Sequence, residues 1–331
     1  MKYRSRKRLL LLFIFIVFLL TLIITPFIGS QPLNYHHVVS YLQGTDSPDG
    51  RIFFDIRLPR ILLAALTGAA LSLAGVVFQA LLRNPLATPY TLGVSSGGAL
   101  GAVVVIKTGL VLSFLGFTTI QIGAFAGSLL TIALVFLLAR QAGRLAIHTM
   151  ILAGVTVSYF FAALILMLHF WADFTETKQM VRWMMGGLDV VNNAALYYTL
   201  PVVLAAAMLI LLQGRMFNLI SMSEEVALSK GVSVSRVQKI AFLSASLMTG
   251  AVVAVSGPIG FVGLIVPHFL RLLIGVDHRY LIPASLFFGG AFLALCDTAA
   301  RTLLAPVDIP VGIITAIIGG PFFLYLLMRH K

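Results

Sequence analysis

Apolar runs long enough to cross a lipid bilayer recur along the whole 331-residue chain. A helix needs roughly 20 apolar residues to cross the hydrocarbon core, and in lipid only helices and closed barrels satisfy their own backbone hydrogen bonds. The short alternating segments of a β-barrel are absent. We therefore predict an all-α polytopic membrane protein with about ten transmembrane helices, folded as one transmembrane domain over 1–331. The predicted spans are 9–28, 58–81, 91–112, 119–139, 147–170, 193–212, 238–257, 259–275, 281–297 and 308–328.

Composition and charge agree with a membrane protein. The chain is 60% hydrophobic and 10% charged, whereas soluble domains carry about 25% charged residues. The net charge of +12 would by itself suit a nucleic-acid partner. With the N-terminus placed inside, however, sixteen of the 23 lysines and arginines fall in inside segments and seven in outside segments, as the positive-inside rule requires. The pattern predicts a multi-pass cell-membrane protein with both termini in the cytoplasm and no nucleic-acid partner.

The basic start of the chain, 1–8, precedes the first apolar run and could belong to a signal peptide. The apolar run is long for that role, and residues 25–30 form a poor cleavage site. We interpret this run as an uncleaved first span.

A short pattern repeats at a constant offset of 182 residues. Thr67-Gly68-Ala69 and Gly75 match Thr249-Gly250-Ala251 and Gly257, and Pro85 matches Pro267. The two copies lie five spans apart, so they would cross the membrane in opposite directions. Small residues also recur by chance in membrane helices, but the pattern favours two five-helix halves related as an inverted repeat, a common construction in transporters.

The chain lacks the residues that usually supply energy or chemistry. No P-loop pattern GxxxxGK[ST] occurs, and acidic residues within the spans, which mark ion relays, are almost absent. A single cysteine, Cys296, excludes an internal disulfide and a multi-cysteine metal site. If the chain transports a solute, its energy is expected from another subunit. An ion-driven secondary transporter, with His169 as its nearest relay candidate, and an intramembrane enzyme are the weaker alternatives.

The longest inside loop, 213–239, contains the features of a short displayed helix. Ser223 can cap the helix, Glu224 and Glu225 lie in its first turn, and Gly231 can end it. Such a helix suits docking into a groove on a cytoplasmic partner. A solvated loop helix with no partner is the alternative.

Two other sets of polar residues lie at span ends. Arg57 and Arg60 are three residues apart and therefore share a helical face, and Arg301 lies at the outer end of span nine. They are candidates to bind carboxylates of a soluble partner, or they extend to the interface as snorkelling side chains. Asn84-Pro85-Leu86 lies at the inner mouth of span two, where it suits a gate or an ordinary tight turn.

These residues together resemble the permease subunits of ABC importers for iron chelates, haem and cobalamin. The matching motifs cover nearly the whole chain in order. They are RLPR at 57–60, GxxFQxLxRNPLAxPxxLGVSSG at 75–97, ILAG at 151–154, RWMMGGL at 182–188, SGPIGFVGLIVPH at 256–268, DxxAR at 297–301 and PVGIITAIIGGPFFLYLL at 310–327.

The resemblance implies a non-enzymatic transport subunit that works with other proteins. The expected partners are a second permease subunit, two cytoplasmic P-loop ATPase subunits and an extracytoplasmic substrate-binding protein. No cofactor is expected in this chain, because ATP would be bound by the ATPase. By the resemblance, Arg57, Arg60 and Arg301 would meet acidic residues of the binding protein.

The resemblance also implies roles on the cytoplasmic side. Asn84 and Leu86 would form a gate, and Ile147 and His148 occupy a second gate position. The ATPase would grip the coupling residues, which are Glu224, Glu225, Ala227, Leu228 and Gly231.

The substrate stays open among members of this family. An iron–siderophore complex is the broadest expectation, with haem and cobalamin as alternatives. Ile147 and His148 depart from the small hydroxyl residues of the cobalamin member, which weakens the cobalamin alternative. A homodimer and a heterodimer of permeases remain equally open.

Overall fold

The computed structural model describes residues 2–141, 144–188 and 193–329. Met1 and Lys331, the ends whose location is predicted above, lie outside this range. Ten apolar helices dominate the described chain, and each matches one predicted span, so the all-α polytopic fold is confirmed. These are α1 (Lys2–Ile24), α4 (Leu58–Leu81), α5 (Val94–Thr108), α6 (Thr119–Ala139), α7 (Ile147–Phe170), α9 (Asn193–Leu212), α12 (Val234–Ser256), α13 (Val262–Ile274), α14 (His278–Thr302) and α15 (Val311–Arg329).

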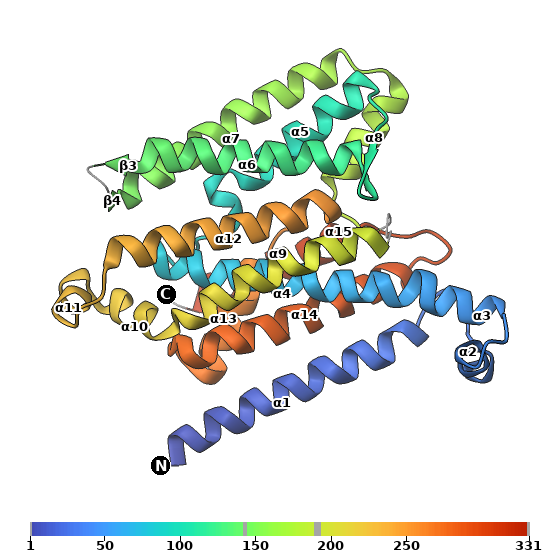
Figure 1. The fold of residues 1–331 in the computed structure, drawn as a ribbon, viewed down its shortest axis with the longest axis horizontal. Coiled ribbons are helices and arrows are strands. Elements are labelled where there is room, and N and C mark those ends of the chain that lie inside the picture. Colours follow the sequence, from blue (N-terminus) through green and yellow to red (C-terminus); the bar gives the residue numbers. More distant parts are fainter. Residues whose placement is uncertain (1, 142–143, 189–192, 330–331) are drawn as a thin grey trace.

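Short elements gather at the two ends of this bundle (Figure 1). At one end, which we call the α3 end, lie α2 (Tyr35–Leu42), α3 (Pro48–Arg51), the π-helical turn η2 (Ile52–Arg57) and α8 (Phe174–Met184). At the other, the α11 end, lie α10 (Gly214–Met222), α11 (Glu224–Ser229) and the antiparallel hairpin of β3 (Arg140–Gln141) and β4 (Arg144–Leu145). The remaining short elements are η1 (Thr25–Phe27), η3 (Pro89–Leu92) and the antiparallel pair β1 (Ser113–Phe114) and β2 (Phe117–Thr118).

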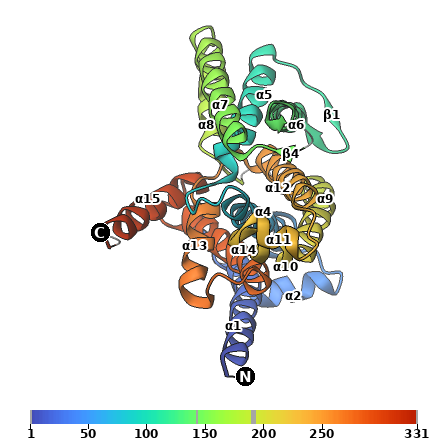
Figure 2. The ribbon, with the colours of Figure 1, turned by 90° about the vertical axis from the view of Figure 1, so that its left-hand side faces the viewer.

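Helix α4 forms the centre of the bundle, with α1 at one edge and α5 to α8 at the opposite edge (Figure 2). It is buried on every side, as expected for a helix that is apolar all round. Two glycines let neighbouring backbones approach it closely. A Cβ at Gly68 would lie 2.2 Å from the carbonyl oxygen of Gly289 in α14, and one at Gly75 would lie 1.9 Å from that of Gly263 in α13. Small residues at such contacts are how membrane helices pack without a hydrophobic drive between them.

Seven helices in the described chain are long and apolar enough to cross a membrane, and three apolar helices, Val94–Thr108, Val262–Ile274 and Val311–Tyr325, are shorter. Helices α5 and α13 begin inside the bundle. The carbonyl of Val94 accepts a hydrogen bond from Ser128, near the middle of α6, and Gly263 lies against Leu71, near the middle of α4. The predicted spans at 91–112 and 259–275 therefore contain shorter α-helices, of 15 and 13 residues, than their bounds indicate.

The segments that precede α5 and α13 meet within the bundle. The hydroxyl of Tyr90 donates to the carbonyl of Ile259 at 2.6 Å and accepts from its N–H at 2.9 Å. Irregular backbone is tolerated at membrane depth only where protein or water satisfies it. Here the tyrosine supplies both missing partners.

The order of helices agrees with two five-helix halves. In each half the third helix, α5 or α13, is a short one, and α4 and α12 run in opposite directions, because α4 starts at the α3 end and α12 at the α11 end (Figure 1). The match of Pro85 with Pro267 is wrong, however. Pro85 lies in the turn after α4, whereas Pro267 lies inside α13.

Candidate functional site

Three arginines, two at the start of α4 and one at the end of α14, meet two aspartates at the α3 end. We call Arg57, Arg60, Arg301, Asp297 and Asp308 the arginine cluster. The side chain of Asp297 is fully buried, and its carboxylate accepts from Nε of Arg60 at 3.1 and 3.2 Å and from Nε of Arg301 at 3.1 Å. Arg60 reaches a second carboxylate, Asp308, at 3.0 Å. Buried charges need such paired and hydrogen-bonded surroundings.

Arg57 takes part differently, because its guanidinium donates to backbone carbonyls. It bonds the carbonyls of Pro26, Phe27 and Gln31, the last at 2.6 Å. Three guanidinium charges in the cluster therefore face two carboxylates. All three arginines are buried side chains, so neither snorkelling nor a freely exposed cationic patch describes them.

The cluster still opens to the surface through a small cavity of about 180 Å³. Its wall contains all three predicted docking arginines together with Asp308 and residues of η2 and the 29–31 segment. The structure thus brings Arg301 to the same place as Arg57 and Arg60, although it lies far from them in the sequence. Sequence reasoning missed Asp308, since nothing in its Pro-Val-Asp loop signals a long-range ion pair.

The predicted gate residue Asn84 lies in a hydrogen-bonded turn that follows α4. Its side chain accepts from the N–H of Leu86 at 2.9 Å, its carbonyl accepts from Ala87, and its own N–H donates to Gln79. These hydrogen bonds form a tight turn, which is one of the two geometries that the sequence suits. Leu86 is exposed at the surface.

The second predicted gate position begins α7 at the same α11 end. Ile147 is the first residue of α7 and packs against the main hydrophobic core, whereas His148 is exposed. The turn and α7 are connected through η3, because Leu92 lies directly against Gly154 of α7.

The predicted coupling segment, 213–239, contains two short helices, α10 and α11, and the start of α12. Ser223 caps α11 by accepting from the N–H of Val226 at 3.0 Å, and Gly231, with φ of +76°, follows its end, as the sequence indicates. Ala227 lies on the buried face of α11 and is fully buried. Glu225 and Leu228 face outward. Helix α10 was not predicted.

Two polar contacts connect this segment to the bundle. Glu224 forms an ion pair with Arg83 at 3.5 Å. The amide of Asn218 in α10 donates to the carboxylate of Asp277 at 2.7 Å and accepts from the N–H of His278 at 2.8 Å, at the start of α14. Neither contact was predicted, since each joins residues far apart in the sequence.

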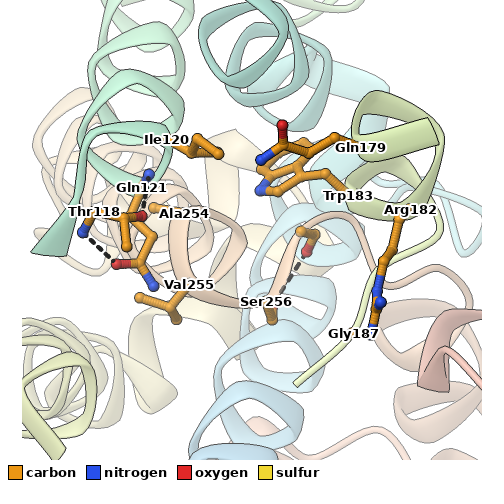
Figure 3. Close-up of a pocket in the computed structure, with 11 residues that line it drawn as sticks. Thr118, Ile120, Gln121, Gln179, Arg182, Trp183, Gly187, Ala254, Val255 and Ser256 are labelled. Carbon is orange, nitrogen blue, oxygen red and sulfur yellow. Dashed lines mark hydrogen bonds between the residues drawn. The ribbon is translucent and has the colours of Figure 1, made fainter. Parts of the chain in front are cut away.

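A larger cavity of about 580 Å³ lies between the start of α6, helix α8 and the end of α12 (Figure 3). Its lining includes the amide side chains of Gln121 and Gln179, and Trp183 lies beside Gln179 in the close-up. Trp183 also packs on the small buried cluster of Ala102, Ala124 and Ala254. Trp183 therefore forms part of the wall of this cavity.

Lys107, in the last turn of α5, forms an ion pair with Glu176 of α8, with 2.8 Å between Nζ and Oε2. This lysine holds the pKa of the Glu176 carboxyl below its usual range. Among the described residues, no group of three or more His, Cys, Asp or Glu side chains could hold a metal ion.

Comparisons with known proteins agree with this arrangement. The sequence matches the profile of the FecCD transport family over residues 14–329. It is 37% identical to the hemin transport system permease protein HmuU of Yersinia pestis over 334 residues, covering 100% of this chain and 98% of that protein. It is 36% identical to the iron(3+)-hydroxamate import system permease protein FhuG of Bacillus subtilis, covering 88% of this chain and 87% of that protein.

A solved structure described as an inward-facing conformation of a metal-chelate type ABC transporter superposes with a TM-score of 0.86. Its chain is 31% identical, and the match covers 97% of this chain and 99% of that one. The fold and these matches define a membrane-embedded permease subunit of an ATP-driven importer, which is not an enzyme. The chain belongs to the FecCD transport family. Its membership decides against an ion-driven transporter and an intramembrane enzyme.

Proposed function

We propose that this permease carries an iron chelate, in the first instance an iron–siderophore complex, across the cell membrane by alternating access. Haem or cobalamin import is the alternative within the same family. The hemin and iron(3+)-hydroxamate permeases among its relatives and the metal-chelate type of its structural neighbour support a metal chelate as the substrate class. Residues 1–331 act as one permease domain, with 213–239 as its coupling segment.

The observation that carries the proposal is that one bundle has an arginine-lined cavity at one end and a capped, outward-facing helix at the other. In the proposed orientation the α3 end faces outside, and the α11 end and both termini face the cytoplasm. The sixteen-to-seven distribution of basic residues supports this orientation.

Substrate delivery would take place at the arginine cluster. Three guanidinium groups against two carboxylates leave an excess of positive charge around a cavity of about 180 Å³, which suits an acidic side chain of an extracytoplasmic binding protein. Arg57 is the best placed to receive it, because its hydrogen bonds go to neutral carbonyls.

Energy would enter at α11. Two cytoplasmic ATPase subunits bind the ATP, and one of them contacts the outward-facing Glu225 and Leu228 and the adjoining Gly231, while Glu224 and Ala227 face the bundle. Asn84 and Leu86, together with Ile147 and His148 as the second gate position, would form the cytoplasmic gate beside the dimer axis.

The test is purification of the complex and measurement of uptake. The permease should copurify with a P-loop ATPase, and proteoliposomes should accumulate a ferric siderophore only with ATP and the binding protein present. Uptake that proceeds without an ATPase would refute the proposal. Uptake of haem or cobalamin, but of no ferric siderophore, would show that the alternative substrate is the correct one.

The docking role has its own test. Replacement of Arg57 by Glu should weaken binding of the soluble protein without loss of the assembled ATPase complex. Unchanged binding would show that the cavity does not receive the partner.

A further inference from the structure

Arg83 occupies a backbone conformation that suits glycine better than arginine. Helix α4 ends at Leu81, and Arg83 follows with φ of +49°, in the left-handed region. The N–H of Asn84 returns to the carbonyl of Gln79 at 3.2 Å, which closes the helix end as a Schellman motif does. Glycine adopts this conformation without steric cost, whereas a residue with a Cβ does not. The arginine side chain is thus present at the expense of backbone strain.

The side chain of Arg83 reaches the first residue of α11. Its Nη2 lies 3.5 Å from Oε1 of Glu224. The same oxygen lies 3.4 Å from Nε2 of Gln238, a buried residue of α12. One carboxylate oxygen therefore joins three elements, namely the end of α4, α11 and α12.

This contact lies between the two parts of the proposed cytoplasmic machinery. Arg83 directly precedes the turn at 84–87, whose hydrogen bonds make it a compact unit. Glu224 belongs to the helix whose opposite face, with Glu225 and Leu228, is open to a partner. A displacement of α11 would therefore act on the turn directly through the contact between Glu224 and Arg83.

We propose that Arg83 is a positioning residue that connects α11 to the turn at 84–87, so that displacement of α11 by the ATPase moves the gate. The inference rests on the proposed function. The side chains of Arg83 and Glu224 are 43% and 42% exposed, and such pairs are weak in water. A partner that covers α11 would exclude water and strengthen the pair at the moment when the link must transmit force.

The decisive variant is Arg83→Gly in the complete complex of permease, ATPase and binding protein. It removes the side chain and introduces the residue that the backbone conformation favours, so the fold is retained. We expect substrate transported per ATP hydrolysed to fall roughly five-fold or more, the range of ordinary coupling effects. Thermal stability and the amount of copurified ATPase should stay at wild-type values.

Arg140→Gly is the matched control, because it makes the same change at an exposed arginine of the β3–β4 hairpin at the same end. It should leave the transport ratio at the wild-type value. Exchange of the pair, Arg83→Glu together with Glu224→Arg, should raise the ratio above that of either single variant.

An unchanged ratio in Arg83→Gly would overturn the inference, and so would a charge exchange that gives no recovery. Both outcomes presuppose that the wild-type complex hydrolyses ATP and transports substrate. Failure of the wild-type permease to bind any ATPase would instead refute the proposed function, so the two failures are distinguishable.

Discussion

The two ends of this permease use charged residues in opposite ways. At the α3 end, the carboxylate of Asp297 is fully enclosed and bonded by two buried guanidinium groups. At the α11 end, Glu224 meets Arg83 in a half-exposed pair at 3.5 Å. Enclosed charges resist displacement because separation would leave them unpaired in a low dielectric. The α3 end is therefore held rigidly by its charges, whereas the charged contact at the α11 end is easier to displace.

The largest expected effect on stability comes from removing the buried charge of Asp297 at the α3 end. Asp297→Asn would leave Arg60 and Arg301 buried without their shared counter-charge, at a cost of about 3–5 kcal/mol in the free energy of unfolding. Thermal or chemical denaturation of the two proteins in detergent measures this change in the free energy of unfolding. The control is Asp308→Asn, which removes a half-exposed partner of Arg60 and should cost at most about 1 kcal/mol. Equal losses in the two variants would show that the cluster is not organised around Asp297.

The next effect concerns the packed centre that joins the two ends. Gly75→Ala would place a Cβ 1.9 Å from the carbonyl oxygen of Gly263, which forces α4 and α13 apart at a cost of about 1–3 kcal/mol. The control is Gly320→Ala in α15, where an added Cβ has no neighbour within 4 Å. Thermal midpoints in detergent should drop for the first variant and not for the second. A drop of the same size in both variants would mean that the close contact between α4 and α13 does not require glycine at position 75.

Sequence patterns predicted the ten helices well, because a bilayer imposes a minimum apolar length that is visible in local composition. They were less accurate where the apolar run continues outside an α-helix, through η3 before α5 and through irregular backbone before α13. Hydropathy does not separate an apolar helix from an apolar extended segment, and the partner that satisfies the latter, Tyr90 for Ile259, lies 169 residues away.

The candidate sites divide in the same way. Local signals identified Ser223 as a cap and Gly231 as an end, since capping depends on neighbouring residues. The spacing of Arg57 and Arg60 indicated a shared face, but it could not show that both are buried or that Asp308 joins them. The pairs Arg83–Glu224 and Asn218–Asp277 depend on tertiary packing and leave no local pattern.

A smaller effect should appear as pH dependence at the α11 end. Arg279 holds the pKa of the Asp277 carboxyl below its usual range, and the amide of Asn218 acts in the same direction, while partial burial opposes them. Because the pKa is lowered in the folded state, the stabilisation is complete above the ordinary aspartate pKa of about 3.9 and is lost as pH falls towards the lower folded value. The solvent-screened contribution should be at most about 1 kcal/mol.

Asp277→Asn provides the measurement, because asparagine is also a good N-cap. The difference in unfolding free energy between wild type and this variant should shrink as pH is lowered from about 5 to about 3. A difference that stays constant over this range would mean that the charge of Asp277 adds nothing beyond its capping role.

The smallest change in stability is expected for Arg83→Gly. Loss of an exposed ion pair costs at most about 1 kcal/mol, and the greater freedom of glycine in the unfolded chain costs about 0.5–1 kcal/mol. Relief of the left-handed conformation at φ of +49° returns about 1–2 kcal/mol. The terms nearly cancel, so the thermal midpoint in detergent should stay close to that of the wild type, even though we expect coupling to fall. A loss of stability as large as that of Asp297→Asn would contradict the comparison. It would mean that the Arg83–Glu224 pair stabilises the α11 end as strongly as the buried ion pairs of Asp297 stabilise the α3 end.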